Sequence, residues 1–229
     1  MKRFYKTATA EQREDGAVVL LDGRVLKTPA KLDMTLPNLA LAEAIAEEWA
    51  AQGESIQPQT MPLMKLAATA IDRTAVDAAP ATADIVRYSG SDLLCYRADM
   101  QVELAARQDE VWQPLLDWFQ RRYDLTMHTT KGIVAVAQPP ELAERLRRLC
   151  AGLDPLRLTA LHTATTVCGS VVIGLALLEA HLDAEAAYEA AFLDELHQAQ
   201  LWGEDEEAAE RRADLKAEIA SLERFLKLL

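Results

Sequence analysis

Strand and turn signals occupy only the first third of this chain, whereas the remainder has helical spacing. The pair Asp22-Gly23 lies between two short apolar runs, Val18–Leu21 and Arg24–Leu26. A tight type I′ turn needs positive φ at both central residues, which Asp and Gly tolerate, so this pair predicts a β-hairpin. The alternating segment Lys31–Leu36 is expected to add a third strand to a small antiparallel sheet.

Helical spacing follows the sheet. Asn38 is expected to cap a helix whose apolar face includes Ile45 and Trp49. A proline-containing segment comes next, and we interpret it as a domain boundary. The predicted fold is α+β: a small N-terminal antiparallel β domain with one helix at residues 1–60, followed by a larger α-helical domain at residues 61–229.

Two later segments support the helical prediction. Leu104–Tyr123 has a broad apolar face at helical spacing and is the clearest helix. Leu158–Leu178 carries no charged residue and is long enough to span a bilayer. However, its polar side chains would be costly in lipid, so we interpret it as buried helical core. Gly169 and Gly174 are expected to mark a break or close packing within it.

The charge of the chain restricts its partners. Net charge is −12 and the isoelectric point is near 4.8. Such a surface repels phosphate backbones and anionic lipid, so we expect neither nucleic-acid binding nor membrane insertion. The acidic surface serves solubility or suits a basic or neutral protein partner.

No motif in the sequence indicates catalysis or metal binding. The three cysteines have no CxxC spacing, and the four histidines have no zinc-site spacing. Nucleophile-elbow and phosphate-binding glycine motifs are also absent from the sequence. Because these motifs are absent, we expect no cofactor, no metal and no enzymatic activity. A small metal-free hydrolase that uses Cys95 with His128, or Ser170 alone, is left as an alternative.

The segment Leu201–Glu207 holds a tryptophan, a glycine and four acidic residues. In one interpretation Gly203 ends a helix and the acids, Asp205 among them, form the solvated first turn of the next helix. In the other interpretation the segment is a binding edge. Glu206, Glu210 and Asp214 would form a mildly self-repelling acidic row at i,i+4 spacing, beside Trp202.

A second aromatic segment contains Trp112 and Trp118. These two residues lie about 600° apart around a helix, so they face different sides. Both could be core residues, or one could face a neighbouring helix or a partner protein.

Short motifs in a fixed order cover nearly the whole chain. They are Arg3-Phe4-Tyr5-Lys6, Leu21-Asp22-Gly23-Arg24, Lys27-Thr28-Pro29, Glu48-Trp49, Met61-Pro62-Leu63, Ala70-Ile71-Asp72, Asp92-Leu93-Leu94-Cys95-Tyr96-Arg97, Arg107-Gln108, Trp112-Gln113-Pro114-Leu115-Leu116-Asp117-Trp118, Leu193-Asp194-Glu195 and Trp202-Gly203. With these motifs the sequence resembles the assembly chaperones that bind the α subunit of the F(1) part of ATP synthase in mitochondria and α-proteobacteria.

The resemblance implies a non-enzymatic function. A protein of this family is expected to bind the free α subunit, shield its β-facing surface from aggregation and hand it over to the β subunit. A glutamate implicated in family function maps to Glu206. The expected partner-binding residues are Glu206, Trp202, Glu210, Asp205 and Trp112. A generic helical interaction scaffold remains a further alternative.

The resemblance also bears on localisation and oligomeric state. The chain shows no targeting presequence, so we expect a bacterial cytoplasmic protein, with eukaryotic relatives in the mitochondrial matrix. We expect the free chaperone to be a monomer.

Overall fold

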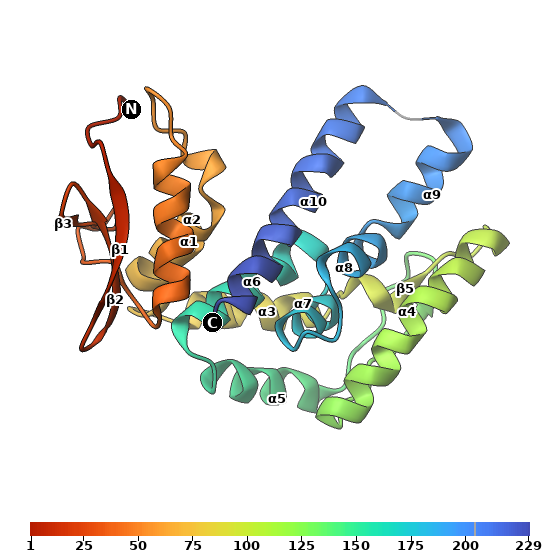
Figure 1. Ribbon diagram of the computed structural model, residues 1–229. Coiled ribbons are helices and arrows are strands. Elements are labelled where there is room, and N and C mark those ends of the chain that lie inside the picture. The colour runs from red at the N-terminus through yellow and green to blue at the C-terminus, as the bar shows by residue number, and fades with distance from the viewer. Residues whose placement is uncertain (204) are drawn as a thin grey trace. The chain divides into compact units, whose positions relative to one another are not determined.

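The computed structural model describes residues 1–203 and 205–229, which form two compact units (Figure 1). Unit 1 comprises Met1–Ala79, Leu153–Ala160 and Arg224–Leu229, and unit 2 comprises Pro80–Gly152 and Leu161–Glu223. An antiparallel sheet near the N-terminus is followed by a mostly helical chain, so the predicted α+β class is confirmed. The division into domains at residue 60 stays a prediction.

Strand β2 (Gly16–Leu21) is the centre of the sheet in unit 1. On one edge it pairs along its whole length with β1 (Ala8–Arg13), and on the other it pairs with β3 (Arg24–Val25) and β4 (Thr35–Leu36). All these pairs are antiparallel. Asp22 and Gly23 join β2 to β3 with φ of 48° and 77°, so the predicted hairpin is confirmed.

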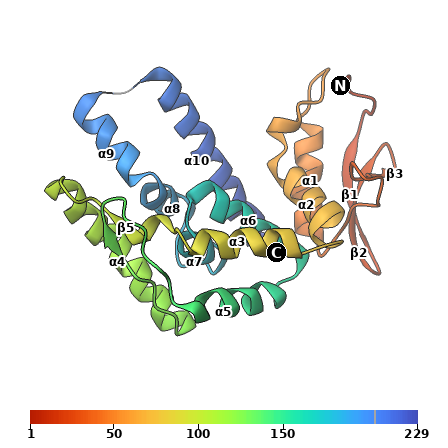
Figure 2. The ribbon, with the colours of Figure 1, turned by 180° about the vertical axis from the view of Figure 1, so that it is seen from behind.

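Helix α1 (Leu39–Ala50) packs on β1 and β2 and covers one face of the sheet (Figures 1 and 2). Its first turn is capped as predicted, because the Asn38 side chain accepts a hydrogen bond of 2.9 Å from Leu41 N. At its other end the Tyr5 hydroxyl donates to Trp49 O over 2.7 Å. The buried face of α1 and the apolar side of β2 thus form the core of unit 1.

A buried carboxylate starts the next helix. The chain passes through the 3-10 turn Pro58–Thr60, helix α2 (Pro62–Thr69) and the π-helical turn Ala70–Thr74. Glu48 accepts hydrogen bonds of 2.8 Å from both Leu63 N and Met64 N. These two N–H groups have no partner within their own helix, so a residue of α1 completes the first turn of α2.

The remaining elements are helices, apart from one short parallel strand pair. In order they are α3 (Ala79–Ser89), the 3-10 turn Leu93–Cys95, β5 (Tyr96–Arg97), α4 (Val102–Tyr123), β6 (Thr130–Lys131), α5 (Pro140–Ala151), α6 (Pro155–Cys168), α7 (Val171–Leu178), α8 (Ala184–Ala191), α9 (Leu193–Trp202) and α10 (Glu206–Lys227).

Helix α7 forms the centre of unit 2, and its residues from Val171 to Leu177 are all buried. Gly169, with φ of 64°, separates it from α6, so the uncharged stretch is two packed helices, as predicted. In the part of the chain that the structure describes, no helix combines the length and apolarity that crossing a bilayer requires.

Gly174 lets α7 approach α6 closely. A Cβ at this position would lie 2.8 Å from Thr165 Oγ1 and 3.3 Å from Leu161 Cδ1. We expect Gly174→Ala to lower the free energy of unfolding by about 1–3 kcal/mol, because the two helices must separate. Urea denaturation checks this, with Gly53→Ala as control, since nothing lies within 4 Å of a Cβ built there. Equal stability of the two variants would contradict the close approach.

Candidate functional site: an apolar end with an acidic edge

The turn between α9 and α10 presents a tryptophan to solvent. Trp202 is the last residue of α9 and is 72% exposed. Gly203 ends the helix with φ of 88°, as predicted. Asp205 caps α10, because its Oδ2 accepts a hydrogen bond of 3.0 Å from Ala208 N. Glu204 lies outside the described residues, so the expectation that it belongs to the first turn stays untested there.

Glu206 and Glu210 follow on the first turns of α10, and both are exposed. Within residues 1–203 and 205–229, no cation forms an ion pair with Glu206, Glu210 or Asp214. Part of this charge is explained by the positive end of the helix dipole. We call Asp205, Glu206 and Glu210 the acidic edge.

Large exposed hydrophobic side chains lie on three segments of unit 2, one of which ends at Trp202. Across the described part of the chain ten such side chains are exposed, and six of them belong to unit 2. We call these six the apolar end: Met100, Val102, Ile133, Val134, Leu201 and Trp202. Soluble monomers rarely leave contiguous apolar surface open without an interaction that uses it.

Strand pairing brings two of the three apolar segments together. Tyr96 and Arg97 of β5 pair with Thr130 and Lys131 of β6. Beyond the strands Gly132 N donates to Arg97 O over 2.8 Å, and a Cβ on Gly132 would lie 3.7 Å from Asp99 Cβ. The loop with Ile133 and Val134 therefore leaves the strand pair beside the segment that leads into α4.

Helix packing brings the third segment to the same end of unit 2. The N-terminal end of α4 and the C-terminal end of α9 lie on the same side of this unit in both views (Figures 1 and 2). Arg107 Nη1 donates to Gln200 Oε1 over 2.9 Å across these ends. Met100 and Val102, at the start of α4, thus share this side with Leu201 and Trp202.

A buried polar network holds α4, α9 and β5 together. The Gln108 amide donates to Asp194 Oδ1 over 2.8 Å and accepts from Ala98 N over 2.7 Å. Arg97 Nη1 donates to Gln108 O over 2.7 Å, and its guanidinium lies 5.2 Å from the Trp112 ring centroid. Because Gln108 and Arg97 are buried and make these contacts inside the unit, their side chains position the surface and do not form it.

Trp112 belongs to this interior. It is 0% exposed, and its Nε1 donates to Ala190 O over 2.8 Å. The interpretation of Trp112 as a core residue is confirmed, and its buried ring is not accessible to a partner protein. Trp118 is half-buried and stacks on His181 with the ring centroids 4.6 Å apart.

The two candidate nucleophiles are also buried. Burial, together with the nearby Asp92 carboxylate, raises the pKa of Cys95 to about 12, so its thiol stays protonated at neutral pH. Ser170 Oγ accepts from Ile173 N over 3.1 Å and caps α7. Neither residue is placed to attack a substrate. Among the residues described, no group of His, Cys, Asp and Glu could hold a metal ion.

The structure thus places Trp202 at the end of α9, Asp205 just before α10, and Glu206 and Glu210 at the start of α10, and it leaves Trp112 in the core. Sequence reasoning missed Met100, Val102, Ile133 and Val134. The available signal was an apolar pair, Ile133-Val134, outside any periodic segment.

An exposed apolar surface with carboxylates beside it is typical of a module that binds another protein. The chain belongs to the ATP12 chaperone protein family, whose model matches residues 2–120. It is therefore a non-enzymatic chaperone of ATP synthase assembly, and its partner class is a subunit of F1.

Individual relatives cover almost the whole chain. The mitochondrial protein atp12 of Schizosaccharomyces pombe is 28% identical, over 96% of this chain and 80% of its own length. The crystal structure of Atp12 from Paracoccus denitrificans is 41% identical with a TM-score of 0.92, and the match covers 99% of this chain and 97% of that chain. An Asp-to-Lys mutant of the same protein matches equally well. Atu1473 from Agrobacterium tumefaciens is 41% identical with a TM-score of 0.92, over 99% of this chain and 85% of its own.

Proposed function

We propose that this chaperone binds the free α subunit of F1 through the apolar end and the acidic edge, and releases it to the β subunit. The observation that carries the proposal is that the three segments bearing the six exposed large hydrophobics of the described part of unit 2 are joined by the β5–β6 strand pairing and by the Arg107–Gln200 hydrogen bond. A subunit awaiting its neighbour exposes apolar surface that is buried in the finished assembly. An apolar end on the chaperone would cover part of that surface and keep it from aggregating.

In the proposed complex, the acidic edge orients the α subunit on the chaperone. The carboxylates of Glu206 and Glu210 lack cationic partners among the described residues, so they are free to attract basic groups that rim the client surface. Rim charges of this kind favour one docking orientation and speed encounter more than they add affinity.

Release needs no chemical energy in this scheme. The α subunit has to bind the β subunit more tightly than it binds the chaperone. Each tenfold difference in affinity in favour of the β subunit requires only about 1.4 kcal/mol. An interface of about 1,600 Å² is large enough to hold the client, and partial coverage keeps it displaceable. We further propose that the free chaperone is monomeric and acts in the bacterial cytoplasm.

Light scattering of isolated α subunit, with and without equimolar chaperone, tests the proposed function. Suppressed aggregation that ends when the β subunit is added, with formation of an α–β complex, supports it. Unchanged aggregation of α in the presence of the folded chaperone contradicts it.

Glu206→Lys is expected to weaken α binding about tenfold without unfolding the chaperone, because it reverses one rim charge. The matched control is Glu207→Lys, on the same first turn of α10 but rotated by about 100° from the acidic row. Both variants lose the same favourable interaction with the helix dipole. Equal affinities of the two variants, measured by titration calorimetry, would remove Glu206 from the proposed surface.

A further inference from the structure

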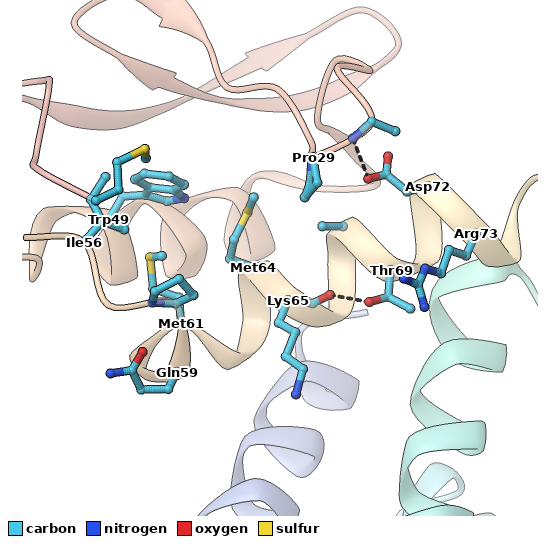
Figure 3. A pocket seen from close by; sticks show the side chains of 14 residues that line it. Pro29, Trp49, Ile56, Gln59, Met61, Met64, Lys65, Thr69, Asp72 and Arg73 are labelled. Carbon is cyan, nitrogen blue, oxygen red and sulfur yellow. Dashed lines mark hydrogen bonds between the residues drawn. The ribbon is translucent and has the colours of Figure 1, made fainter.

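Unit 1 contains a groove of about 850 Å³ that the apolar end does not involve. Its lining is mostly apolar. Trp49, Ile56 and Met61 lie at one end, Asp72 and Arg73 lie at the other, and Met64 lies between them (Figure 3). The volume falls within the range of ligand-binding pockets, about 300–1,000 Å³. All residues that line it, apart from Met1, lie in the segment matched by the family model.

Two polar atoms in the groove lining lack a hydrogen-bond partner among the described residues. Trp49 Nε1 is a buried donor on a side chain that is only 6% exposed. Asp72 Oδ1 is a buried acceptor, while Oδ2 of the same carboxylate accepts from Ala30 N over 3.0 Å. More than nine in ten buried polar groups in proteins are hydrogen-bonded, so these two atoms indicate an absent partner.

The rim of the groove is basic, although the chain carries a net charge of −12. Lys65 and Arg73 are both exposed, and neither forms an ion pair with any residue that the structure describes. A ligand that complements this rim carries a negative charge.

We propose that the groove binds an extended apolar segment of a partner protein that bears acidic side chains. A peptide backbone supplies both missing partners, because its carbonyl accepts from Trp49 Nε1 and its N–H donates to Asp72 Oδ1. A fatty acid matches the apolar lining and the basic rim, but it has no N–H group to donate. Met61 and Met64 are flexible and adapt to different apolar side chains, and their movement opens the two buried atoms to the segment.

The indole resonances of the whole protein test this proposal directly. In a ¹⁵N-labelled sample, a capped peptide of Val and Leu ending in two Glu residues is expected to shift the Trp49 Nε1–H signal downfield. The Trp112 signal is the internal control, because that indole already donates to Ala190 O in unit 2. Trp49→Phe assigns the signal.

Charge reversal tests the basic rim. Lys65→Glu with Arg73→Glu is expected to weaken binding of this peptide about tenfold. The control reverses two exposed cations of unit 2, Arg121→Glu with Arg147→Glu, and is expected to leave the affinity unchanged.

The proposal is overturned if the Trp49 signal stays in place with the peptide, or shifts with laurate alone. It is also overturned if a peptide ending in two Lys binds as well as the one ending in two Glu. Because the peptides are synthetic, none of these results depends on capture of the α subunit by unit 2.

Discussion

Substituting Ile133 and Val134 together by Asp is expected to weaken binding of the free α subunit by about 100-fold, or about 2.7 kcal/mol. Both side chains are open to solvent, at 99% and 70% exposure, so the folded chaperone loses little stability. In the complex the new carboxylates would lose their hydration against an apolar client surface, which is costly without a cationic partner. Titration calorimetry with isolated α subunit measures the effect.

The chain offers a like-for-like control for this experiment. Val76 in unit 1 is 75% exposed, so Val76→Asp makes the same chemical change as Val134→Asp at nearly the same exposure. We expect Val134→Asp alone to weaken binding clearly and Val76→Asp to leave it unchanged. Equal losses from both substitutions would mean that added negative charge, and not the apolar end, determines the affinity.

Asp92→Ala is expected to lower the free energy of unfolding by about 3–5 kcal/mol, because several buried donors would lose their acceptor at once. Asp92 is fully buried. Its Oδ1 accepts from Leu94 N over 3.0 Å, and its Oδ2 accepts from Val171 N over 2.7 Å and more weakly from Val172 N. The Ser170 hydroxyl also donates to this carboxylate.

Urea denaturation measures this effect when Asp92→Ala is compared with a substitution that removes an exposed helix cap. Asp183 caps α8 from the surface of the same unit, with a bond of 2.8 Å from Ala186 N. Asp183→Ala is expected to cost about 1 kcal/mol. If Asp92→Ala costs no more than Asp183→Ala, the buried carboxylate is not what joins the 3-10 turn to α7.

The stability of the wild-type protein should also depend on pH through Asp92. Burial raises the pKa of Asp92 from 3.8 to about 6, so the folded state holds this proton more tightly than the unfolded chain. The contribution of the group is therefore greatest below pH 4 and falls as pH rises through 6, by up to about 3 kcal/mol. Asp92→Asn does not titrate at this position, so the stability difference between wild type and this variant should shrink over that range. A constant difference would contradict the raised pKa.

Local signals predicted the elements whose stabilising contacts are themselves local. The hairpin at Asp22-Gly23 and the Asn38 cap depend on residues within a few positions, and both are confirmed. Strand β1 was missed because most of its residues are polar and exposed, and its pairing is set by β2. Gly53 lies where a left-handed glycine often ends a helix, but α1 ends at Ala50 and Gly53 has no positive φ.

Longer-range packing decided the candidate site. Periodicity placed Trp112 and Trp118 on different sides of α4. The packing that buries Trp112 involves Ala190, 78 residues away in the chain, whose carbonyl accepts the hydrogen bond from the Trp112 indole. The apolar end could not be predicted, because it joins three segments through strand pairing and helix packing that leave no periodic trace.

The three cysteines determine whether a bound protein could become attached to the chaperone through a disulfide. All are free and buried, and burial raises the pKa of Cys95, Cys150 and Cys168 to about 12, about 11 and about 12. Almost no thiolate therefore exists at neutral pH to attack a client cysteine or to react with peroxide. A mixed disulfide with a bound protein is therefore not expected while the chaperone is folded, so the proposed binding of a client would stay reversible even under oxidising conditions.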